Sequence, residues 1–82
     1  MMTLLKLRRG RYLLVEEKIP GDSGAVGRAI QDLAFPAHSV IAAVIRGGEI
    51  LIPRGALTFE AGDEVLAICD SAAADELAKI FA

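Results

Sequence analysis

Few side chains in this sequence could carry catalytic chemistry. The chain has one histidine, His38, and one cysteine, Cys69, and the two lie far apart in the sequence. Catalysis needs a nucleophile next to its base, paired carboxylates in a cleft, or a metal ion. The 11 acidic residues are dispersed over expected turns and helix ends. We therefore expect no catalytic residues, and the sequence indicates a protein that is not an enzyme.

The same residue counts exclude other kinds of site. A single cysteine cannot form an internal disulfide or a cysteine-based metal cluster, and a lone histidine lacks the other ligands of a zinc site. We expect no metal ligands and no cofactor, and the lone thiol favours a reducing cytoplasm. The longest apolar run, Val40–Ile45, is too short to span a membrane, and the first residues do not resemble a secretory signal.

Anion binding is a remaining possibility, because the basic residues are unevenly placed. The net charge is −2, yet the segment Lys6–Arg11 is strongly basic. Such a segment could contact phosphate groups. Its other interpretation is a solvated lead-in, because it has none of the interleaved aromatic residues of a typical nucleic-acid site. We treat residues 1–10 as a basic lead-in or linker and do not expect nucleic acid to be the principal partner.

The elements that must position these side chains follow from the spacing of apolar residues. Residues 12–19 alternate in hydrophobicity, which predicts a strand. Residues 22–34 carry apolar residues at i, i+4 and i+7, which predicts a short amphipathic helix with Asp22 or Ser23 as its cap. Pro36 requires an extended residue before it, so this helix would end near residue 34.

A glycine pair predicts the next supersecondary element. Gly47-Gly48 separates the apolar segments 40–45 and 50–52. A type I′ turn needs positive φ at both of its central residues, so this arrangement is a strong β-hairpin signal.

The two-residue turn also fixes the register of that hairpin. Arg46 then faces Glu49 as an opposite-charge pair. If the ladder extends, Ala42 lies opposite Pro53, and Ile41 lies opposite Arg54. This register makes Arg54 the better phosphate-binding candidate and makes Arg46 a cross-strand partner of Glu49.

The C-terminal part predicts a strand and a helix. Residues 64–70 read as a strand that is apolar on both faces, with Cys69 buried in it and Asp63 serving the turn before it. Ser71 would cap a closing helix. The predicted order is strand, helix, strand, strand, strand, helix. We therefore expect residues 11–82 to form a small α+β domain, with two helices packed on a mostly antiparallel sheet.

The apolar content predicts a partner surface. Hydrophobic residues make up 54% of the chain, which is more than one small core needs. We therefore expect a homodimer.

Residues 12–82 resemble a known family. Residues 40–55 read VIAAVIRGGEILIPRG and residues 59–68 read FEAGDEVLAI. This order of an apolar strand, a basic-glycine turn, an Ile-Pro break and a Gly-Asp turn resembles the TrkA C-terminal (RCK-C) domain family. The resemblance implies a dimeric, non-catalytic regulatory domain of a potassium or cation transport system. Its partner would be a membrane cation transporter or channel subunit, which would hold it in the cytoplasm, peripheral to the inner membrane.

The resemblance also implies a ligand site. Some members of that family bind a small effector, including cyclic di-AMP, between two copies of the domain. On this sequence the corresponding positions are Leu33–Phe35, His38, Ser39, Val40, Ile41 and Pro53, with Arg54 close by. Val40 is apolar where known cyclic di-AMP binders place a polar group, so another nucleotide or small effector is an alternative ligand. His38 could stack on a base, or it could be a solvated loop residue.

Two further functions stay open. The chain could be a structural dimerisation module without a ligand, or a nucleic-acid-associated domain that uses residues 6–11. Ligand-induced shifts in melting temperature distinguish the first from an effector sensor, and salt-dependent DNA binding would support the second.

Overall fold

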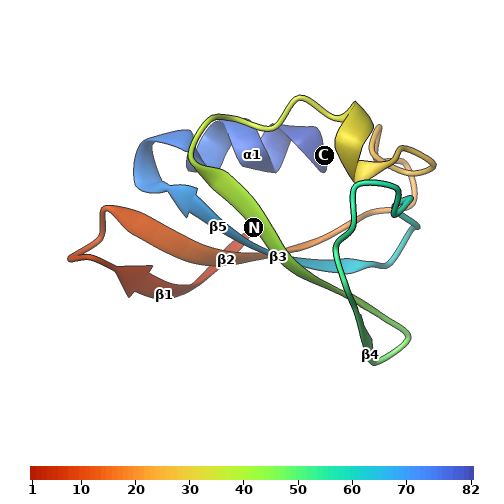
Figure 1. Ribbon diagram of the computed structural model, residues 1–82, viewed down its shortest axis with the longest axis horizontal. Helices are drawn as coiled ribbons and strands as arrows, with labels where there is room; N and C mark the ends of the chain where they lie inside the picture. The colour runs from red at the N-terminus through yellow and green to blue at the C-terminus, as the bar shows by residue number, and fades with distance from the viewer.

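The computed structural model describes residues 1–82, and its centre is one five-stranded antiparallel sheet (Figure 1). Along the sheet the strands lie in the order β1-β2-β5-β3-β4. In chain order the elements are β1 (Met2–Leu7), β2 (Tyr12–Lys18), the 3-10 helix η1 (Ile30–Asp32), β3 (Ser39–Arg46), β4 (Glu49–Leu51), β5 (Glu64–Asp70), the 3-10 helix η2 (Ser71–Ala73) and α1 (Ala74–Ile80). The fold is mostly β with one short α-helix, so the predicted α+β class with two packed helices holds only loosely.

Residues expected to form a lead-in instead form the edge strand β1. It pairs antiparallel with β2, and the register shifts at Leu4, which forms a bulge between Thr3 and Leu5. The β1–β2 hairpin closes through a loop in which Arg8 and Arg9 have φ values of 52° and 58°. The bulge makes the spacing of apolar residues in β1 irregular, so a simple alternating pattern does not predict this strand.

The helix predicted over residues 22–34 is absent, and this prediction was wrong. Gly27 adopts a φ of 83°, which no helix interior allows, and only the single turn η1 is helical. The backbone here bonds instead to the segment before β5: Gly27 donates to the Phe59 carbonyl, and Phe59 donates to that of Arg28. The Ser23 hydroxyl accepts from the Ala25 amide, so it caps a turn rather than a helix.

The core lies between one face of the sheet and the elements that cover it. Figure 1 shows α1 and the β2–β3 connection on the same side of the sheet. Leu77 and Phe81 from the C-terminal helix region are buried there, and the rings of Phe59 and Phe81 meet edge to face. The cap of this C-terminal segment is the Asp70 carboxylate, which accepts from the Ala72 amide, rather than Ser71.

The other face of the sheet is open and apolar. The strand registers align one row across four strands, formed by Leu5, Leu14, Ile68 and Val40. Leu5 is 56% exposed and Val40 is 61% exposed. The sequence predicted that β5 is covered on both faces, but within one chain only the Val65, Ala67 and Cys69 face is buried. We name the row of Leu5, Leu14, Ile68 and Val40 the open-face row.

Candidate functional site

The hairpin predicted from the glycine pair is present. Gly47 and Gly48 have φ values of 59° and 81°, as a type I′ turn requires. Arg46 lies opposite Glu49, and the ladder continues from that pair as far as Val44 and Leu51. The local part of the predicted register is therefore confirmed.

The predicted extension of that ladder is wrong. β4 ends at Leu51, so Pro53 does not pair with Ala42 and Arg54 does not pair with Ile41. Proline has no amide hydrogen to donate to a ladder. In addition, the register of β3 against β5 shifts at Ala42, and a bulge of this kind bends β3 and interrupts a regular ladder.

Arg54 lies instead in a loop next to η1. Its amide donates to the Ile52 carbonyl, and the carbonyl of the following residue, Gly55, accepts from the Gln31 amide at 2.9 Å. The Arg54 side chain is exposed and makes neither a hydrogen bond nor an ion pair within the chain. It is therefore a free guanidinium on the surface.

The other candidate residues mark the start of β3. His38 is exposed with a φ of 59°, an uncommon conformation for a residue other than glycine. The Ser39 hydroxyl donates to the Pro36 carbonyl, and Ile41 packs against the core. Val40 points to the opposite face, where it ends the open-face row next to Ile68. Ser39 and Ile41 therefore fix the strand, while His38 and Val40 remain accessible.

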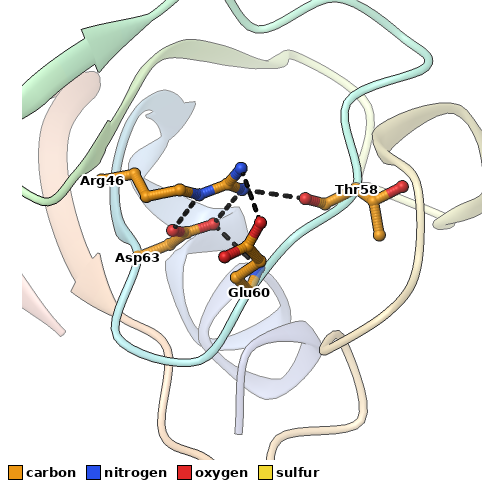
Figure 2. Close-up of polar contacts among 4 residues, drawn as sticks. All are labelled: Arg46, Thr58, Glu60 and Asp63. Atoms are coloured by element: carbon orange, nitrogen blue, oxygen red, sulfur yellow. Dashed lines mark hydrogen bonds and ion pairs between the residues drawn. The ribbon is translucent and has the colours of Figure 1, made fainter.

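Arg46 is the centre of the only extensive polar network. Figure 2 shows its guanidinium surrounded by Asp63, Glu60 and Thr58. Nε and Nη2 donate to the two carboxylate oxygens of Asp63, each at 2.8 Å. Nη2 also donates to the Thr58 carbonyl at 2.9 Å, and Nη1 lies 2.9 Å from a Glu60 carboxylate oxygen. The predicted ion pair with Glu49 is wrong, although Glu49 is the register partner.

The network has the properties of a structural clamp. Asp63 is 1% exposed, and it also accepts from the Glu60 amide at 2.9 Å, which confirms its predicted role in the turn. The hydrogen bond from Arg46 lowers the pKa of Asp63, and the same bond raises the pKa of Arg46. Because each of its three nitrogens already contacts a partner, Arg46 is a poorer candidate for a ligand than Arg54.

The remaining chemically active side chain is buried. Cys69 has no exposed surface, and desolvation raises the pKa of its thiol, with a further contribution from the Asp70 charge. This confirms its predicted place in the core. The structure brings no group of three or more His, Cys, Asp or Glu side chains together.

Comparison with known proteins decides the family. Residues 14–82 match the TrkA-C domain. The chain belongs to the TrkA-C domain family. This domain, also called RCK-C, is a non-catalytic regulatory domain of Trk potassium uptake proteins. The family assignment expected from the sequence is thereby confirmed.

Curated relatives give the same assignment. A Trk system potassium uptake protein TrkA homolog from Archaeoglobus fulgidus is 41% identical over 67 residues, which cover 82% of this chain and 15% of that protein. TrkA from Halomonas elongata is 43% identical over 63 residues, covering 73% and 14%. TrkA from Mycobacterium tuberculosis is 26% identical over 81 residues, covering 99% and 37%. The TrkA-C chain thus spans well under half the length of these relatives.

A solved structure has the same fold. It is described as "Structure of RCK domain with cda", and it superimposes with a TM-score of 0.74 at 19% identity, covering 84% of this chain and 97% of that one.

None of the helices of the TrkA-C chain has the length and apolar character that a membrane-spanning helix needs.

Proposed function

We propose that this TrkA-C chain is a dimeric, effector-sensing domain that regulates a potassium or cation transporter from the cytoplasm. Its effector would be cyclic di-AMP, the ligand of the solved RCK domain with the same fold, or another small nucleotide. Binding across two copies would change their relative orientation, and a membrane transporter subunit would respond to that change.

The observation that carries the proposal is the position of Val40. It ends the open-face row and is 61% exposed, and it lies two residues after the exposed His38. A second copy that covers the open-face row would therefore bring the two His38–Val40 segments close to the interface between the copies. A two-fold effector suits a site that is built from two identical halves.

The charged part of the proposed site is Arg54. A planar guanidinium binds phosphate through paired donors, and that of Arg54 has no partner within the chain. The loop that holds it bonds to η1 through Gly55 and Gln31, and the chain continues from η1 through Leu33–Phe35 to His38. We propose Pro53, Leu33–Phe35, Ser39 and Ile41 as the supporting wall of the site.

Calorimetry with cyclic di-AMP tests the effector. Arg54→Ala should weaken binding by about 1.5–3 kcal/mol, the scale of a hydrogen bond to a charged group. Arg9→Ala, which removes the same charge from an exposed position in the β1–β2 loop, is the matched control and should change binding little. Equal losses in both variants would contradict the assignment of Arg54. Absence of binding by the parent chain would favour the structural dimerisation module.

Light scattering behind a sizing column tests the dimer. The expected mass is twice the chain mass of 8.7 kDa. Val40→Lys should give a monomer, because a charge buried in an apolar interface is left unpaired. Ile52→Lys places the same charge at another exposed apolar residue, outside the open-face row, and should remain dimeric. A parent chain that is monomeric at micromolar concentration would remove the interface site.

A further inference from the structure

A second charged feature lies outside the residues that match the TrkA-C family. The loop of the β1–β2 hairpin and its flanks carry Lys6, Arg8, Arg9 and Arg11, which we name the basic tip. All four side chains are exposed, and none forms an ion pair within the chain. The strand register places the Asp70 carboxylate, opposite Tyr12, nearest to the basic tip. This carboxylate accepts from the Ala72 amide and forms no ion pair with the four basic side chains. The positive charge is therefore not neutralised by the protein.

The backbone of the basic tip is strained at Arg8 and Arg9. Arg8 and Arg9 both have left-handed φ values, 52° and 58°, where glycine or asparagine would fit without the same steric conflict. Strain of this kind is commonly found at functional positions. Arg11 lies over the ring of Tyr12, 5.4 Å from its centre, which holds a third cation at the same place.

The shape of the basic tip favours a flat partner. Figure 1 shows the β1–β2 loop at one end of the longest axis of the molecule, which is 34 Å long, so the loop projects rather than lining a groove. A few cations on a projecting loop can meet phosphates that lie in one plane. Duplex DNA is a poorer match, because its binding proteins usually neutralise six or more phosphates along a track. Leu4, in the bulge of β1 two residues before Lys6, is 40% exposed and adds an apolar side chain to the same strand.

We propose that the basic tip binds the phosphate headgroups of an anionic lipid bilayer. The forked donors of Arg8 and Arg9 would contact lipid phosphates, while Lys6 and Arg11 add attraction to the negative surface. The long axis of the domain would then stand away from the membrane. This site is separate from the proposed effector site, since it needs neither Val40 nor Arg54.

Co-sedimentation with vesicles tests the proposal. The parent chain should bind vesicles of phosphatidylcholine with about one third phosphatidylglycerol, and should not bind pure phosphatidylcholine. The double variant Arg8→Gly with Arg9→Gly should lose roughly 25-fold in affinity, about fivefold for each charge. Glycine suits both backbone conformations, so this variant keeps the fold. The matched control, Arg28→Gln with Lys79→Gln, makes the same change in net charge elsewhere and should bind like the parent.

Four results would overturn the proposal. The first is equal binding to neutral and anionic vesicles, and the second is an equal loss in the control variant. The third is stronger binding to a DNA duplex than to anionic vesicles at the same ionic strength. Inorganic phosphate distinguishes a lipid surface from a site for the free ion: displacement of the chain from vesicles by millimolar phosphate, at constant ionic strength, would also count against the membrane.

Discussion

Arg46 and Asp63, which are 17 residues apart in the sequence, meet through two parallel hydrogen bonds of 2.8 Å each. The pair ties the end of β3 to the turn that precedes β5. The Glu60 amide donates to the same carboxylate, so one buried side chain fixes both the hairpin and the turn. The stability of the domain should therefore depend strongly on this carboxylate.

Asp63→Asn should lower the free energy of unfolding by about 2–3 kcal/mol, because it removes the charge from a buried, bidentate pair. Urea denaturation monitored by circular dichroism measures the loss. Glu60→Gln removes the other ion-pair partner of Arg46. The Glu60 side chain is 63% exposed, so this change should cost less than about 1 kcal/mol. Similar losses in the two variants would contradict the clamp.

The same pair should make stability depend on acid. Because Arg46 lowers the pKa of Asp63 in the folded state, the unfolded chain binds the proton more readily. The contribution of the pair is then complete above the ordinary carboxyl pKa of about 4 and is lost as the pH falls through the lowered value. Urea midpoints of the parent and of Asp63→Asn should converge in acid. A gap between them that stays constant down to about pH 2 would contradict this.

The Cys69 thiol should react slowly in the folded protein. It has no exposed surface, and burial raises its pKa, so little reactive thiolate is present at neutral pH. Labelling with a bulky aromatic disulfide reagent should be slow in buffer and rapid in denaturant. Fast stoichiometric labelling of the native protein would show that the thiol is reachable and would reopen a redox role.

Removal of backbone strain at the basic tip should stabilise the domain. Arg8→Asn or Arg9→Asn should each raise the free energy of unfolding by about 0.5–1 kcal/mol, since asparagine tolerates positive φ better than arginine. Arg11→Asn serves as the control, because Arg11 is not among the residues with positive φ. A gain at Arg11 equal to that at Arg8 would show that charge repulsion, rather than strain, is relieved.

Local sequence patterns predicted the central strands well. Alternation of apolar residues placed β2 close to its observed bounds, and a segment apolar on both faces did the same for β5. The Gly47-Gly48 pair predicted both the hairpin and its register near the turn. These features depend on neighbours in the sequence, because the strand period and the turn geometry are local. The burial of Cys69 followed from its place in the apolar strand 64–70.

The errors arose where distant segments decide the structure. Residues 22–34 have the spacing of a helix, but their backbone groups find partners in the segment that includes Phe59. Arg46 has an evident partner in Glu49, yet it turns to Asp63 on a loop that the hairpin pattern does not include. The position of Arg54 was extrapolated from a ladder that Pro53 and the Ala42 bulge interrupt. Tertiary contacts override local preference in each case.

The strand order has a consequence for how the chain is made. β5, near the C-terminus, lies between β2 and β3 and bonds to both, whereas β2 and β3 do not pair with each other. Until residues 64–70 leave the ribosome, the chain can form only two separate hairpins, and an isolated hairpin is marginally stable in water. The sheet can therefore close only after residues 64–70 are available, when β5 joins the two halves through contacts of high sequence separation.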